Sequence, residues 1–117
     1  MTNKGSTRHY SDMQEKSVAH ALNGYQQSNS GAGHFRKGDV VIPSASMLCE
    51  CKCSMSEKQS FSIKKEWIVK NKQEAMSQRL SSQCIAFNFE PDGENYYVIN
   101  ETLMRALVDY LKEYYNE

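Results

Sequence analysis

The chain has 117 residues, of which 39% are hydrophobic, and its formal net charge is zero. This length suits one domain with one core, so we expect a single domain over residues 1–117. No run approaches the roughly 18 apolar residues of a membrane-spanning helix, and the polar first residues lack the apolar segment of a secretion signal. The composition argues against a membrane-spanning protein and predicts a soluble, cytoplasmic one.

The zero net charge conceals an uneven distribution along the chain. Residues 1–80 carry twelve Lys and Arg against seven Asp and Glu, whereas residues 81–117 carry two against seven. The larger, N-terminal part is therefore basic, which is compatible with a surface that contacts nucleic acid.

The predicted elements combine helices and strands. They are defined by helix-capping residues, by apolar residues spaced three and four positions apart, by alternating apolar residues, and by turns that contain Pro or Gly. In chain order we predict a flexible basic arm (1–10), a helix (11–22), a polar loop with glycines (26–33), two strands (39–42 and 47–52) joined by a turn (43–46), a polar loop (54–60), the longest helix (61–79), a hairpin of two strands (84–89 and 96–99) and a final helix (100–115). This order predicts an α/β (α+β) fold with a mixed central sheet flanked by helices.

The most informative segment joins Asp39 to Glu50-Cys51-Lys52. In a strand, Glu50 and Lys52 project from one face, about 6.7 Å apart along the chain. If the two strands fold back at residues 44–45, Asp39 lies directly opposite Glu50, with Cβ atoms about 5 Å apart. Two carboxylates at that separation repel unless a cation lies between them, and Mg²⁺ is the natural occupant. A lysine beside such an ion can hold a metal-bound water or stabilise a transferring phosphoryl group.

This motif, Asp39…Glu50-Cys51-Lys52, resembles the PD-(D/E)xK motif of a nuclease superfamily. Flanking segments resemble its small phage and archaeal Holliday-junction-resolvase-like branch, and the resemblance extends from about residue 8 to residue 89. One departure is that Gly38 stands where the motif has proline. The flanking segments are Gln14-Glu15-Lys16, Asn29-Ser30-Gly31-Ala32-Gly33 and Ser60-Phe61-Ser62-Ile63-Lys64-Lys65-Glu66-Trp67.

The resemblance implies the restriction-endonuclease-like αβββαβ core and a role for each matching residue. Asp39, Glu50 and the Cys51 main-chain carbonyl would ligate Mg²⁺. Mn²⁺ is expected to substitute for Mg²⁺ at this site. Lys52 would be the catalytic lysine, and Glu15 would reach the metal from the first helix, directly or through water. Ser30 would lie near the scissile phosphate. The implied function is a Holliday-junction resolvase that hydrolyses phosphodiester bonds as a homodimer, with a phage genome and DNA recombination as its setting.

Each of these interpretations has a simpler alternative. Asp39, Glu50 and Lys52 could form an ordinary solvated strand face, and Glu15 an ordinary helix surface. At the level of the whole protein, a PD-(D/E)xK nuclease for DNA ends, flaps or restriction-like sites remains open, as does a non-catalytic DNA-binding module. Basic residues that would contact phosphates, or else form a solvated surface, are Arg8, Lys16, Arg36, Lys37, Lys64 and Lys65.

Three further features of the sequence bear on its function. The alternating Cys49, Cys51 and Cys53 would point to one face of a strand, which favours reduced core thiols over a zinc site or disulfides. Trp67 is predicted to anchor the core rather than to stack on a base. The apolar face of the final helix either covers the sheet or forms a dimer surface, since a four-way junction offers two symmetric strands to a C2 dimer.

Overall fold

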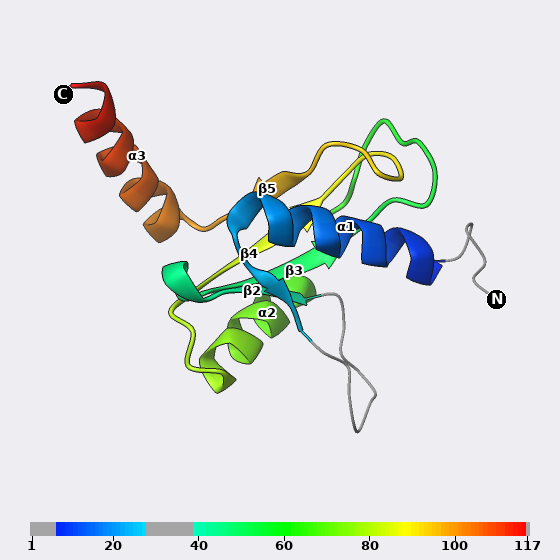
Figure 1. The fold of residues 1–117 in the computed structure, drawn as a ribbon, viewed down its shortest axis with the longest axis horizontal. Helices are drawn as coiled ribbons and strands as arrows, with labels where there is room; N and C mark the ends of the chain where they lie inside the picture. Colours follow the sequence, from blue (N-terminus) through cyan, green and yellow to red (C-terminus); the bar gives the residue numbers. More distant parts are fainter. Residues whose placement is uncertain (1–6, 28–38, 117) are drawn as a thin grey trace.

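The computed structural model describes residues 7–27 and 39–116 of the chain. Its elements follow in the order α1 (Thr7–Leu22), β1 (Tyr25–Gln26), β2 (Asp39–Ile42), the 3₁₀ helix η1 (Pro43–Ala45), β3 (Met47–Lys52), α2 (Lys65–Ser77), β4 (Ser82–Phe87), β5 (Tyr96–Val98) and α3 (Glu101–Tyr115) (Figure 1). The predicted α/β class with a mixed sheet is thereby confirmed. The expected α-β-β-β-α-β order is present from α1 to β4.

The five strands form one sheet in the order β1-β2-β3-β4-β5. β3 and β4 are parallel, and the other neighbouring pairs are antiparallel. The crossover between β3 and β4 contains α2, as parallel neighbours require a long connection. The chain order of these strands therefore places the two predicted strands of the motif side by side near the middle of the sheet.

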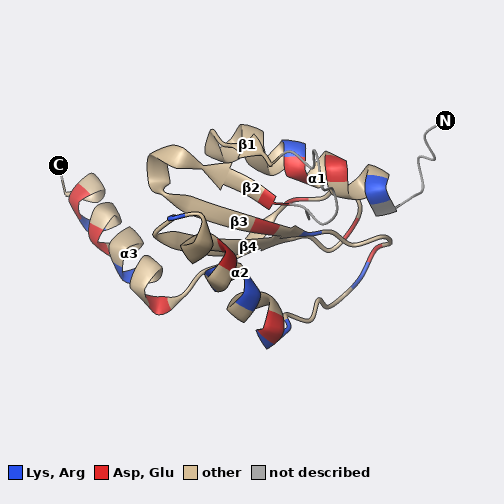
Figure 2. Ribbon diagram, turned by 90° about the horizontal axis from the view of Figure 1, so that it is seen from below, with Lys and Arg blue, Asp and Glu red and all other residues tan. Residues whose placement is uncertain are grey.

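Two helices cover opposite faces of the sheet: α1 lies above the strands and α2 below them in Figure 1, and Figure 2 views the sheet from the α2 side. On the α1 face, Val18 packs with buried strand residues that include Val40 and Cys49. On the α2 face, Val41 and Leu48 pack with Ala75 of α2. Neighbouring residues of one strand thus enter different cores because successive side chains of a strand point to opposite faces.

Several predicted boundaries were wrong. α1 begins at Thr7, so the part of the predicted arm that the structure describes is helical. Gln26, expected in a loop, belongs to the short strand β1 and pairs with Val40 of β2. α2 begins at Lys65 rather than at residue 61, and β4 covers residues 82–87 rather than 84–89. Phe61 precedes the helix because its ring stacks on Phe87 of the sheet, with ring centroids 5.0 Å apart.

The ends of β3 and β4 are joined by a buried polar pair. The Ser54 backbone N–H donates to Asn88 Oδ1 at 2.7 Å, and Ser54 Oγ donates to the Asn88 carbonyl at 2.7 Å. Both residues are about 1% exposed. The pair satisfies backbone groups where the ladder between the two strands ends.

Replacing Asn88 by alanine should therefore destabilise the protein by about 2 kcal/mol, because the Ser54 N–H is left buried without an acceptor. Urea unfolding measures this change. Asn116→Ala, which removes an exposed side chain at the end of α3, is the matched control and should change the free energy of unfolding by less than about 0.5 kcal/mol. Equal stability of Asn88→Ala and the parent would contradict the assigned role.

α3 lies apart from the sheet and the other helices (Figure 1). Asn100 caps its N-terminus as predicted, since its Oδ1 accepts the Leu103 N–H at 2.9 Å. No residue of α3 is buried, so the predicted alternative in which this helix covers the sheet is wrong. None of the helices in the described parts of the chain is long and apolar enough to span a bilayer.

Candidate functional site

Asp39 and Glu50 are direct cross-strand neighbours, as the sequence predicted. β2 and β3 pair in the register that joins Asp39 to Glu50 and Ile42 to Met47. η1 closes this hairpin, and Ser46 adopts a left-handed conformation (φ 49°) with its N–H bonded to the Pro43 carbonyl. The turn thus fixes the register, and the register fixes the pair of carboxylates.

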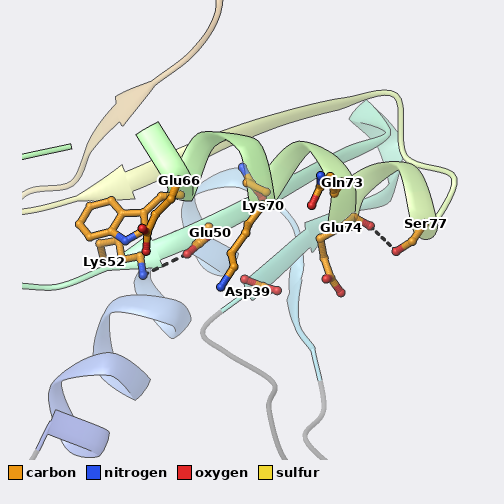
Figure 3. A pocket seen from close by; sticks show the side chains of 10 residues that line it. Asp39, Glu50, Lys52, Glu66, Lys70, Gln73, Glu74 and Ser77 are labelled. Atoms are coloured by element: carbon orange, nitrogen blue, oxygen red, sulfur yellow. Dashed lines mark hydrogen bonds and ion pairs between the residues drawn. The ribbon is translucent and has the colours of Figure 1, made fainter. Parts of the chain in front are cut away.

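The side chains of these two acids and of Lys52 all lie on the α2 side of the sheet. They share a pocket of about 790 Å³ whose other wall is one side of α2, and Figure 3 shows the labelled side chains of the two walls facing one another. The strand residues alternate as predicted, because Cys49 lies in the core on the opposite face. The pocket is lined by Asp39, Glu50, Lys52, Glu66, Trp67, Lys70, Asn71, Gln73, Glu74 and Ser77.

Lys52 is held in place by two contacts. Its Nζ lies 3.1 Å from Glu50 Oε2 and 4.4 Å from the centre of the Trp67 ring. The ring attracts the ammonium group through its negative face, and the aliphatic stem is only partly exposed. The Lys52 ammonium group is therefore preorganised beside the Glu50 carboxylate, which is one of the two opposed carboxylates.

α2 contributes residues that the sequence did not assign to this site. Trp67, predicted to be a core anchor, is half-buried in the pocket wall against Lys52. Figure 3 shows the Lys70 side chain extending from α2 toward Asp39, which is only 7% exposed. The position of Lys70, beside the apolar residues of this helix, predicts a solvent-exposed side chain instead. The spacing of the apolar residues of α2 predicts which side of the helix faces the sheet. It does not predict that long polar side chains beside these residues extend to the strands.

The strand residues fit a hard divalent cation in part. Two carboxylates on neighbouring strands suit Mg²⁺, which keeps several waters and is often held by one or two carboxylates. The Cys51 thiol packs on the α1 face, so only its main-chain carbonyl could serve as a ligand. Within residues 7–27 and 39–116, no three His, Cys, Asp or Glu side chains are grouped to hold a metal ion. Asp39 and Glu50 would therefore need water or substrate oxygens to complete the coordination.

Glu15, expected as a further ligand, is not among the residues that line the pocket. It belongs to α1, on the other face of the sheet, and its Oε1 accepts a hydrogen bond from Gln26 Nε2 at 2.9 Å. Burial raises the pKa of this carboxyl, although the bond from Gln26 opposes the shift. The structure thus places Glu15 in a local network with Gln26 and Asp12, which also accepts from Gln26.

A raised pKa means that ionised Glu15 opposes folding at neutral pH. We expect Glu15→Gln to be more stable than the parent at pH 7, because glutamine keeps the acceptor oxygen without the charge. The advantage should shrink as the pH falls and disappear below the ordinary value of 4.5, where the carboxyl becomes protonated in both states. Urea unfolding at pH 4 and pH 7 in EDTA measures it, and a stability difference independent of pH would contradict the assignment.

The basic residues predicted to contact DNA do not all share one face. Arg8 and Lys16 belong to α1, where Lys16 pairs with Asp12 at 3.0 Å. Lys64 and Lys65 stand at the start of α2, the helix that forms the second wall of the pocket, although neither lines the pocket itself. Ser30, Arg36 and Lys37 lie outside the described residues. Of the described residues in this group, Lys64 and Lys65 are thus the ones carried by the helix that borders the pocket.

The cysteines are reduced, and two of them are core residues. Cys49 and Cys84 are buried, while Cys51 and Cys53 are partly exposed. Cys49 lies opposite Cys84 in the β3–β4 register, and the neighbouring thiols and burial raise the pKa of both thiols. These two thiols remain protonated and pack as small apolar side chains, as expected for Cys49.

Comparison with known proteins found no matching family model, no similar curated protein and no similar solved structure.

Proposed function

We propose that the chain is a Mg²⁺-dependent, structure-selective DNA endonuclease, and specifically a Holliday-junction resolvase that acts as a homodimer. One observation carries the proposal: Asp39 and Glu50 are opposed in the sheet, and Lys52 follows Glu50 on the same face, all within one pocket. An ordinary solvated strand face accounts less well for an aspartate that is 93% buried beside a second carboxylate.

Each side chain has a defined part in hydrolysis. Asp39 and Glu50 would hold Mg²⁺, which when bound supplies charge stabilisation for the phosphoryl group and lowers the pKa of its water. Lys52 donates hydrogen bonds toward the scissile phosphate and stabilises the negative charge that develops on its oxygens. Trp67 keeps the Lys52 ammonium group in position, and Lys64 and Lys65 attract the DNA backbone to the open side of the pocket.

DNA shape is the proposed basis of selectivity. In the described residues the pocket is bordered by the sheet and α2, with no separate element to read bases in a groove. A small enzyme of this kind would recognise the geometry of a branched backbone rather than a base sequence.

Cleavage of a synthetic four-way junction tests the proposal. The parent protein should cut the junction with Mg²⁺ or Mn²⁺, leave it intact in EDTA, and act far more slowly on a linear duplex of the same sequence. Ca²⁺ provides a control for binding without cleavage. Equal cleavage of the linear duplex would replace the resolvase by a nuclease for other DNA. Junction binding without any metal-dependent cleavage would refute the enzyme and leave a DNA-binding module.

A further inference from the structure

α3 has an exposed apolar side that the pocket does not explain. Met104, Leu107, Val108, Leu111 and Tyr114 are all at least about a third exposed. At 100° per residue they lie on one side of the helix, because their spacings are three and four. Large apolar side chains gathered on one helix face mark an interaction surface.

α3 also lacks the packing that normally stabilises a helix of its length. Its 15 residues correspond to about 22 Å, or about four turns. Isolated helices of about 12–15 residues are only marginally stable in water, and tertiary packing of an apolar face usually supplies the rest. No such packing occurs within the described chain, since α3 has no buried residue.

The charges beside the apolar face of one α3 are complementary to those beside the same face of a second copy. Glu101 and Lys112 are eleven residues apart, which is about three turns, so both lie along the same border of that face. In an antiparallel pair of identical helices each border faces its own copy. Glu101 would then face Lys112 of the second copy at both ends of the pair. Arg105 pairs with Glu101 of its own helix at 3.0 Å, whereas Asp109 lies on the side of the helix opposite the apolar face and would point to solvent.

We propose that α3 is the dimerisation element of this protein and packs antiparallel against α3 of a second copy. The two-fold axis passes near Leu107, which meets its own copy, and Leu103 packs against Leu111 of the second copy. Two Glu101–Lys112 pairs border this apolar contact. The interface leaves the pocket of each copy open, because α3 extends away from the sheet. This self-association does not require nuclease activity.

Leu107→Glu tests the apolar contact. It places two carboxylates at the two-fold axis and should raise the dimer dissociation constant at least about thirtyfold, as for a central interface residue. Sedimentation equilibrium without DNA or metal measures the constant. Because Leu107 is not buried in the single chain, circular dichroism and thermal unfolding should show an intact sheet. A parent that remains monomeric at 100 μM, or a variant that dimerises like the parent, would overturn the proposal.

A mixing experiment tests the antiparallel register. Glu101→Lys and Lys112→Glu each bring like charges together in both border pairs and should weaken self-association about tenfold. An equimolar mixture at 0.15 M salt should form a heterodimer about as tight as the parent, since each Lys then meets a Glu. Each chain keeps its own helix stability in both dimers, so only the contact between chains differs.

The matched control makes the same charge change on the far side of α3. Asp109→Lys replaces Glu101→Lys in the mixture with Lys112→Glu; it changes the net charge by the same amount but should self-associate like the parent and show no preference for the Lys112→Glu chain. Equal heterodimer preference in both sets would show unspecific attraction and overturn the register. Failure of the Glu101→Lys and Lys112→Glu chains to pair would also overturn it. Junction cleavage is scored separately, so either proposal can fail alone.

Discussion

Lys52→Ala should lower junction cleavage about a hundred- to a thousandfold and leave junction affinity close to that of the parent. The loss follows from the removal of a preorganised charge that acts on the transition state, an interaction usually worth several kcal/mol. The 3.1 Å contact with Glu50 and the 4.4 Å approach to Trp67 hold this ammonium group in one place. Single-turnover cleavage at saturating protein, together with a binding isotherm in Ca²⁺, separates turnover from affinity.

Lys58→Ala is the matched control for this variant. Lys58 is exposed and does not line the pocket, so its loss should change turnover less than about threefold, as expected when only a peripheral phosphate contact is affected. Lys52→Arg should retain the charge but recover little activity, because the longer planar group does not fit the same position beside Glu50. Turnover of Lys52→Ala at the parental rate would remove Lys52 from the mechanism.

Leu48→Ala should have the largest effect on stability, a loss of about 3 kcal/mol. Leu48 is fully buried between Val41 and Ala75, where α2 meets the sheet. The cavity left by the smaller side chain would also loosen the helix that carries Trp67 and Lys70. Urea unfolding measures the loss, and cleavage should fall at temperatures at which the variant is still mostly folded.

Met76→Ala, on the exposed side of α2, provides the comparison. Met76 is 66% exposed, so its truncation should cost less than about 0.5 kcal/mol. A Leu48→Ala variant as stable as Met76→Ala would mean that α2 does not depend on this contact.

The register of the carboxylate pair could be predicted from the sequence because it depends on local rules. The turn signal at residues 43–46 sets the middle of the hairpin, and the two-residue period of a strand sets the faces. Together they place Asp39 opposite Glu50, and Cys49 on the other side of the sheet, as the structure has them. Neither inference required knowledge of what packs on the sheet.

The second wall of the pocket could not be predicted in this way. Which residues of α2 reach the strands depends on the height and angle of the helix on the sheet, and these follow from contacts such as Leu48 with Ala75. Lys70 stands at the border of the apolar stripe, where spacing alone assigns it to solvent. Phe61 shows the same effect, since its apolar spacing favoured helix while its stacking on Phe87 keeps it outside.

Trp67 is the sole tryptophan of the chain, and its indole lies against the Lys52 ammonium group. Intrinsic fluorescence excited at the indole band therefore originates beside the proposed reacting groups. A ligand that draws Lys52 toward a phosphate should alter the emission intensity without any added dye. Titrations with divalent ions and with branched oligonucleotides can thus be followed optically on the unmodified chain.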